Sequence, residues 1–192
     1  AKAVSEIIRT TLGPRSMLKM LLDPMGGIVI TNDGNAILRE IDVSHPAAKS
    51  MIELSRSQDE EVGDGTTSVI ILAGELLYQA EPFLLRQMHP TVIVRAFHRA
   101  MEAALAICDE MAVDVDTDNP AEMRAIIRSC LGTKMVSRYG DLMCDLAMQA
   151  VSTVSVTRAD GTKDINLKHF ARVEKLPGGE LEDCRVLNGV MF

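Results

Sequence analysis

The residues best suited to chemistry lie in the stretch Glu60–Leu72, where a polar loop runs directly into an apolar segment of helical period. Gly63–Gly65 places an aspartate between two glycines, which let a backbone turn sharply and approach a ligand closely. Thr66–Ser68 then falls in the first helical turn, where free N–H groups, the helix dipole and three hydroxyls suit a phosphate. The carboxylate of Asp64 is a hard oxygen ligand of the kind that Mg²⁺ prefers. The alternative is that Asp64 and Thr66 only cap the helix.

Three further polar turns could contribute to the same chemistry. Thr11–Pro14 ends the first predicted helix, Asn32–Gly34 presents a carboxylate, and Gly132–Lys134 presents a hydroxyl and an ammonium group between two helices. Each turn alone indicates no more than a helix stop, a hairpin turn or a helix linker. Together with Asp64 they supply the backbone donors, carboxylates and cation needed to hold a nucleotide.

Several standard enzyme signatures are absent from the sequence. It contains no G-x-x-x-x-G-K-[ST] and no G-x-G-x-x-G, which disfavours a P-loop NTPase, a protein kinase and a Rossmann enzyme. It also lacks the G-x-S-x-G elbow of a serine hydrolase. The spacing of residues therefore leaves the class of nucleotide protein open.

Composition limits the class of protein further. The 192 residues are 47% hydrophobic, with 12 Met, no Trp and 3% aromatic residues, which favours an aliphatic helical core. A net charge of −7 disfavours nucleic acid as the main partner. The four cysteines form no C-x-x-C pair, so we expect small buried side chains in a reducing compartment. Apolar runs too short for a membrane span and the lack of a signal peptide predict a soluble cytosolic protein.

The first part of the chain predicts a mainly α domain with an inserted β-hairpin. Helices are expected over 4–12, over 17–22, from an N-cap at Ser44 to Glu61, over 66–81 and over 91–111. The helix over 66–81 is apolar on most of its surface, so it should be largely buried and should kink or end at Pro82. The hairpin is predicted from strands 28–31 and 36–41 around Asn32–Gly34.

After the acidic linker 113–120 the pattern predicts a small α+β unit. Helices of about 120–131 and 135–150 are followed by strands 151–157 and 163–167, and then by strands 173–176 and 184–187. The chain begins at Ala1 inside a helical pattern and ends in the apolar run 189–192. We therefore expect a fragment of a longer chain, in which other segments complete this sheet.

Three separated pieces of the sequence closely resemble the group II chaperonins. They are Thr11–Pro14 with Met17–Met20, Thr31–Gly34, and Gly63–Ser68 with Leu72–Leu77, all in the family's order. Within the family, Leu22–Val29 and Ala171–Gly179 are most similar to one subunit type of the eukaryotic cytosolic chaperonin. The resemblance covers essentially the whole chain.

The resemblance implies a fold and an activity. Residues 1–116 would be the N-terminal part of the equatorial, ATP-binding domain, and residues 117–192 the first segment of the intermediate domain, leading toward an apical domain outside this sequence. The whole protein would be one of several paralogous subunits in a hetero-oligomeric, cytosolic double ring. That ring would fold unfolded clients, such as proteins of the actin and tubulin type, through Mg²⁺-dependent ATP binding and hydrolysis to ADP. Neither nucleic acid nor membrane would be a partner.

The resemblance also implies roles for individual residues. Asp64 would bind Mg²⁺, and Asp33 would be catalytic, organising the attacking water or a K⁺ ion. The remaining residues expected to contact the nucleotide are Leu12, Gly13, Pro14, Gly65, Thr66, Thr67, Ser68, Thr133 and Lys134.

Two other functions stay open on the sequence. One is a structural ring subunit with little or no ATP turnover, and the other is a small phosphotransfer enzyme that uses Gly63–Ser68 as its phosphate cradle. The family's second intermediate segment and its C-terminal equatorial segment are absent from these 192 residues. We therefore expect this segment alone not to hydrolyse ATP.

Overall fold

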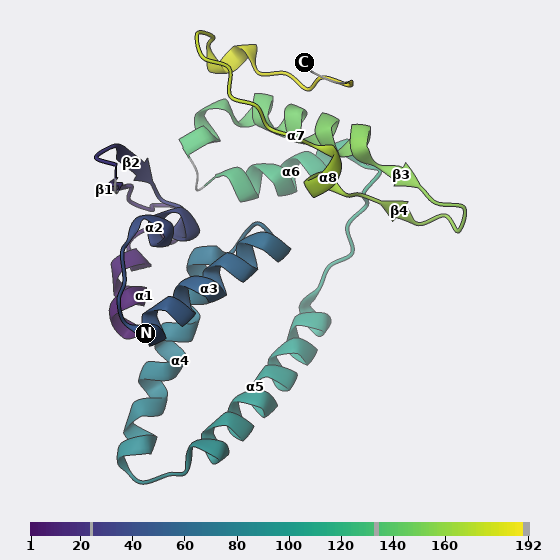
Figure 1. The fold of residues 1–192 in the computed structure, drawn as a ribbon. Coiled ribbons are helices and arrows are strands. Elements are labelled where there is room, and N and C mark those ends of the chain that lie inside the picture. The colour runs from purple at the N-terminus through teal and green to yellow at the C-terminus, as the bar shows by residue number, and fades with distance from the viewer. Residues whose placement is uncertain (24, 133–134, 190–192) are drawn as a thin grey trace. The chain divides into compact units, whose positions relative to one another are not determined.

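Helices dominate the structure, a computed structural model that describes residues 1–23, 25–132 and 135–189 (Figure 1). The chain divides by its internal contacts into two units, Ala1–Val113 and Asp114–Phe192. The mainly helical character predicted from the sequence is confirmed. The assignment of 1–116 to an equatorial domain and of 117–192 to an intermediate domain stays a prediction.

The first unit contains five helices and one hairpin among its described residues. In chain order these are α1 (Lys2–Arg9), β1 (Lys19–Leu22), β2 (Ile28–Thr31), α2 (Gly34–Glu40), α3 (Pro46–Glu61), α4 (Thr66–Leu85) and α5 (Pro90–Met111).

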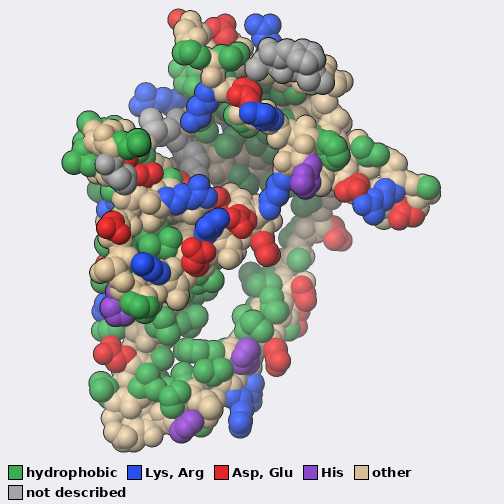
Figure 2. Space-filling view, viewed as in Figure 1, with side chains coloured by type: hydrophobic (Ala, Val, Ile, Leu, Met, Phe, Trp, Pro, Cys, Tyr) green, Lys and Arg blue, Asp and Glu red, His purple; other side chains and the backbone are tan. Residues whose placement is uncertain are grey.

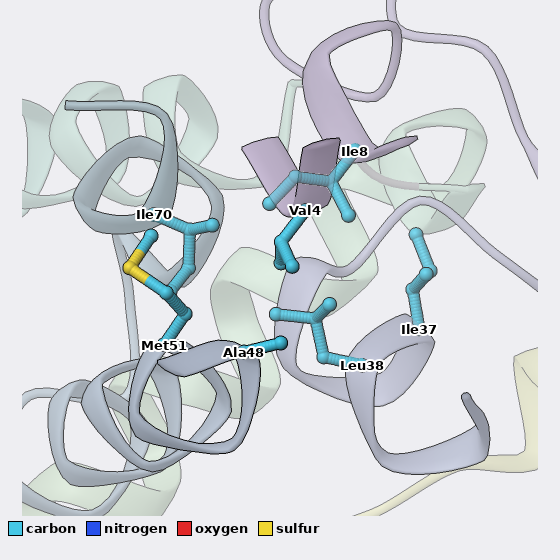
Figure 3. Close-up of a cluster of buried hydrophobic side chains, with 7 residues drawn as sticks. All are labelled: Val4, Ile8, Ile37, Leu38, Ala48, Met51 and Ile70. Atoms are coloured by element: carbon cyan, nitrogen blue, oxygen red, sulfur yellow. The ribbon is translucent and has the colours of Figure 1, made fainter. Parts of the chain in front are cut away.

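The core of this unit gathers aliphatic side chains from α1, α2, α3 and α4 (Figure 3). In α1 and α3 the two buried residues are three or four positions apart, so they lie on one face of the helix. In α2 the two buried residues are adjacent, and α4 contributes one residue. The buried cluster is Val4, Ile8, Ile37, Leu38, Ala48, Met51 and Ile70. Burial of these side chains fixes the relative positions of the helix ends on which the predicted site residues lie.

The predicted hairpin of 28–31 with 36–41 is wrong, as is the helix predicted over 17–22. Strand β1 pairs antiparallel with β2, from Lys19 opposite Thr31 to Leu22 opposite Ile28. Asp23 favours this turn because its Oδ1 accepts the amides of Met25 at 2.9 Å and Gly27 at 2.6 Å.

Residues 36–40 are helical because Asp33 acts as an N-cap. Its Oδ2 accepts the Ala36 amide at 3.0 Å and thereby starts α2 at Gly34. A similar cap starts α3, where Nδ1 of His45 accepts the Ala47 amide at 3.1 Å. The N-cap predicted at Ser44 is therefore displaced by one residue, although Pro46 occupies the first turn as expected.

Helix α4 begins at Thr66 as predicted, but it continues through Pro82 to Leu85 instead of ending there. Its buried residues are Thr66, Thr67, Ile70, Gly74 and Ala80, so the expectation of a largely buried helix is wrong for this chain. By length and composition α4 could cross a membrane, contrary to the expectation that no run is long enough. Core helices of soluble proteins meet the same criterion, and α4 packs on α1 and α3.

Helix α5 has no buried residue, and it diverges from α4 after the turn that joins them (Figure 1). Hydrophobic side chains gather over the lower part of the view, where α4 and α5 lie (Figure 2). The large exposed hydrophobic residues there include Leu72, Leu77, Val92, Val94, Met101, Leu105 and Ile107. This surface is larger than soluble monomers usually expose.

The second unit is built on two helices. In chain order its elements are α6 (Pro120–Leu131), η1 (Met135–Tyr139), α7 (Gly140–Val154), β3 (Val156–Thr157), β4 (Lys163–Asp164), α8 (Leu167–Phe170) and η2 (Leu181–Asp183). Arg124 pairs with Asp145, and Arg128 with Asp141, to join α6 to α7.

Several expectations for this unit need correction. The hairpin around Asp160 exists, but each strand has only two residues because α7 runs on to Val154. Residues 173–176 and 184–187 form no strand in the part of the chain that the structure describes. Cys144 is buried as expected, whereas Cys108, Cys130 and Cys184 are exposed.

Candidate functional site

The Asp33 turn and the start of α4 are joined directly by hydrogen bonds. The Thr66 hydroxyl donates to Asp33 Oδ1 at 3.2 Å, and the Gly34 amide donates to Thr67 Oγ1 at 3.1 Å. A Cβ at Gly34 would lie 2.6 Å from Thr67 Oγ1 and 2.9 Å from Thr67 Cα, so only glycine permits this approach. The N-termini of α2 and α4 therefore meet, with the carboxylate of Asp33 between them.

The loop before α4 holds Asp64 at the surface. Gly63 and Gly65 have φ of 77° and 74°, a region that favours glycine, so both are required for this turn. Asp64 is exposed, and its Oδ1 accepts the Gly65 amide at 2.8 Å. Ser68, in the first turn of α4, is also exposed. An accessible carboxylate and hydroxyl thus flank the positive end of a 20-residue helix.

The loop after α1 contacts the Asp33 turn. Gly13 has φ of 95°, and its carbonyl accepts the Ser16 amide at 3.1 Å, which folds the loop back on itself. The Asn32 side-chain amide donates to Ser16 Oγ at 2.9 Å. This bond links the segment that holds Leu12 and Pro14 to the residue just before Asp33.

Three of the four predicted turns are therefore joined by hydrogen bonds within the first unit. Thr133 and Lys134 lie outside the described residues. The residues that the hydrogen bonds bring together are Ser16, Asn32, Asp33, Gly34, Thr66 and Thr67, with Asp64 and Gly65 immediately before them. Leu12, Gly13 and Pro14 are linked to this group through Ser16.

Gln58 is a residue of this region that the sequence analysis missed. Its side-chain amide donates to the Asp64 carbonyl at 3.0 Å from the last turn of α3. Glutamine in a helix among charged residues is common on any surface, and nothing in its spacing marks a contact across the helix end. Only the geometry of the loop shows that Gln58 contacts Asp64.

The donor set fits a Mg²⁺–nucleotide better than a metal ion alone. Among the described residues, no three His, Cys, Asp or Glu side chains come together to hold a metal. Mg²⁺ is usually held by one or two carboxylates together with substrate phosphates and water. The exposed Asp64 beside the N-terminus of α4 supplies one such carboxylate and the neighbouring phosphate donors.

A separate pocket of about 480 Å³ lies between α2 and α3. It is lined by Asn35, Leu38, Arg39, Ile41, Asp42, Val43, Lys49, Ile52, Glu53, Arg56 and Glu60, none of which is a predicted site residue. Its mixed charges give it no preference for an anion. We therefore place the candidate site at the three linked loops instead of in this pocket.

Comparison with known proteins decides the family. The TCP-1/cpn60 chaperonin family matches residues 4–192. The chain belongs to this chaperonin family. It is 60% identical over 192 residues to T-complex protein 1 subunit gamma of Arabidopsis thaliana and 62% identical over 192 residues to that of Schizosaccharomyces pombe. The Bos taurus protein of the same name is 60% identical over 192 residues.

These matches cover all of this chain but only 35%, 36% and 35% of the three chaperonin relatives. The chain thus spans about a third of the length of the curated relatives it matches. The resemblance to group II chaperonins, and to the gamma subunit in particular, is confirmed.

Proposed function

We propose that the chain is part of a subunit of an ATP-dependent chaperonin, with its nucleotide site at the linked loops. The observation that carries the proposal is the junction of Asp33–Gly34 with Thr66–Thr67. It sets the carboxylate of Asp33 between two helix N-termini, and Thr66 of this junction is two residues from a second carboxylate, Asp64. Membership of the chaperonin family supports the same conclusion.

Different residues of the linked loops would bind the phosphates and the metal of the nucleotide. The amide groups at the start of α4 and the exposed hydroxyl of Ser68 would donate to phosphate oxygens. The backbone at Leu12–Pro14 would contribute further donors. Asp64 would hold Mg²⁺ together with phosphate oxygens and water, and the ion would neutralise phosphate charge.

Asp33 would act in a different way from Asp64. It is half-buried, and it accepts hydrogen bonds from the Ala36 amide and the Thr66 hydroxyl, which fix its orientation. A fixed carboxylate suits the positioning of an attacking water, or of a monovalent cation such as K⁺. Thr133 and Lys134 would complete the nucleotide contacts, as the resemblance implies.

The larger assembly is part of the proposal. The relatives' name, T-complex protein 1 subunit gamma, supports a hetero-oligomeric ring of paralogous subunits. We propose that this ring lies in the cytosol and folds unfolded clients, including those of the actin and tubulin type. The net charge of −7 supports a role without nucleic acid.

The test is ATP binding and hydrolysis by the full-length protein in its ring. Asp64→Ala should weaken Mg²⁺-dependent labelling of this subunit by a photoreactive ATP analogue by at least about tenfold. Asp109→Ala, which removes an exposed carboxylate from α5, is the matched control and should bind as the wild type does. Equal labelling of Asp64→Ala and wild type would contradict the proposed metal ligand.

A native mass measurement completes the test. A large particle containing several related subunits supports the ring. A monomer or small oligomer of the full-length protein would contradict it and leave only a nucleotide-binding domain. Labelling of this subunit without any contribution to hydrolysis would instead support the structural ring subunit.

A further inference from the structure

Gln58 contacts the loop before α4 both through its backbone, which ends α3, and through its side chain. Its backbone carbonyl accepts the amides of Val62 at 3.0 Å and of Gly63 at 3.2 Å. Its side-chain amide crosses the loop and donates to the Asp64 carbonyl at 3.0 Å. One residue at the end of α3 therefore holds a backbone group of each of three successive loop residues, Val62, Gly63 and Asp64.

The side-chain bond has a particular effect on the Asp64–Gly65 peptide. In a trans peptide the carbonyl and the amide point in opposite directions. Gln58 holds the carbonyl, so the Gly65 N–H is directed to the other side, where it meets Asp64 Oδ1 at 2.8 Å. A Cβ at Gly65 would lie 3.6 Å from Gln58 Nε2, so the amide group also packs against this glycine.

Support at Gly65 matters because glycine has many backbone conformations open to it before the loop is ordered. Gly65 is the N-cap of α4 with φ of 74°, and it follows a second glycine of positive φ at position 63. Glycine loses more conformational freedom on ordering than any other residue. A hydrogen bond from a helix, whose backbone is already fixed, lowers the number of orientations open to the Asp64–Gly65 peptide.

We infer that Gln58 is a positioning residue for nucleotide binding, which orients the Asp64–Gly65 peptide so that its N–H faces the phosphate. The inference rests on the proposed function and adds a residue that touches neither nucleotide nor metal.

The test replaces Gln58 in the full-length protein and uses two measurements. Gln58→Met keeps an unbranched side chain with similar helix propensity but removes the donor. Gln58→Glu keeps the shape and replaces the amide by oxygen. Without nucleotide, both variants should exchange the amide hydrogens of residues 62–66 faster than the wild type. Both should bind Mg²⁺–ADP about 3- to 10-fold more weakly, as expected for one hydrogen bond.

Gln79→Met is the matched control. Gln79 is exposed on α4 and its Nε2 donates to Glu75 Oε1 at 3.1 Å, far along the helix from the loop. This variant should leave both measurements unchanged. Thermal stability within about 1 °C of wild type for both Gln58 variants would exclude a general loss of structure.

The outcomes separate this inference from the proposed function. Unchanged exchange in Gln58→Met overturns the positioning role. Faster exchange with unchanged Mg²⁺–ADP affinity overturns the link to nucleotide. Absence of Mg²⁺–ADP binding by the wild type overturns the proposed function and this inference together, whereas faster exchange with weaker binding supports both.

Discussion

Asp33 and Asp64 look alike in the sequence, each beside a glycine in a polar turn, but their surroundings differ. Asp33 is half-buried and is held by the Ala36 amide and the Thr66 hydroxyl. Asp64 is exposed and bonds to the amide of the next residue. A carboxylate fixed by two donors suits orientation of a reactant, and an exposed one suits coordination of an incoming ion.

A third aspartate, Asp160, lies in the turn between β3 and β4. The Thr162 hydroxyl donates to Asp160 Oδ1 at 2.6 Å and the Thr162 amide donates to it at 3.0 Å, which lowers the pKa of Asp160. Because this pKa is lower in the folded chain, the carboxylate stabilises the turn above the usual Asp value, about pH 3.9. That stability is lost as the pH falls through the lowered pKa.

Replacement of Thr162 tests this cause. Thr162→Val removes the hydroxyl, the larger contribution, and should raise the pKa of Asp160 toward its usual value. Titration of the Asp160 carboxyl carbon by NMR measures the change. Thr157→Val, in the same hairpin on β3, should leave the pKa of Asp160 where it is. A pKa in Thr162→Val equal to that of the wild type would show that the hydroxyl is not the cause.

At the scale of elements, contact between α1 and α4 depends on a glycine. A Cβ at Gly74 would lie 2.5 Å from Ser5 Oγ and 2.6 Å from Ser5 Cβ, and Ser5 Cβ is fixed to the backbone of α1. Alanine would gain about 1 kcal/mol in helix propensity, but overpacking costs about 1–3 kcal/mol. Because the two helices cannot separate without loss of core contacts, we expect Gly74→Ala to destabilise the chain.

Denaturant unfolding measures this effect as a lower midpoint for Gly74→Ala. Ser5→Gly in the same chain should restore much of the loss, because it removes the atoms that meet the new methyl group. Gly140→Ala at the start of α7 is the control, since the nearest atom to its Cβ would be Arg128 Nε at 3.9 Å. A midpoint for Gly74→Ala at or above that of the wild type would contradict the packing argument.

The errors in predicting elements have a physical origin. Residues 19–22 are a short apolar run, and periodicity cannot tell a strand from a helix at that length. Residues 36–41 resemble a strand in composition, but the cap at Asp33 and burial of Ile37 and Leu38 make residues 36–40 helical. In both places a side chain outside the run, Asp23 or Asp33, decides the structure.

The loop that holds Asp64 between two glycines before a helix could be predicted from the sequence, because glycine and aspartate act locally there. The role of Asp33 as the N-cap of α2 could not, since the sequence predicts a hairpin turn at that position. The sequence also could not show that Thr66 and Thr67 contact the Asp33 turn 33 residues away, since that contact depends on packing of α2 against α4. Gln58 was missed for the same reason.

At the scale of the whole molecule, the apolar surface of α4 and α5 fits a protein larger than this chain. Helix α5 is 22 residues long and none of them is buried. Most of the stability of a helix in a protein comes from packing of its apolar face. We therefore expect neighbours outside this chain, which spans about a third of its relatives' length, to cover the exposed apolar faces of α4 and α5.

Hydrogen exchange tests whether α5 depends on neighbours outside this chain. In the 192-residue chain, amides of α5 should exchange much faster than those around Ile70 in α4, which is fully buried. The same α5 peptide in the full-length protein is the control and should be strongly protected. Equal protection of α5 in the two proteins would mean that this helix needs no further partner.

The bond between Asp64 and the Gly65 amide has a consequence for the binding of phosphate and metal at the loop. Without nucleotide, a carboxylate of the chain already occupies an amide that a phosphate oxygen would use. If a phosphate binds at this loop, one of its oxygens would replace the Asp64 carboxylate at the Gly65 amide. Asp64 would then be available to hold Mg²⁺, so binding of the phosphate and binding of the metal would each favour the other.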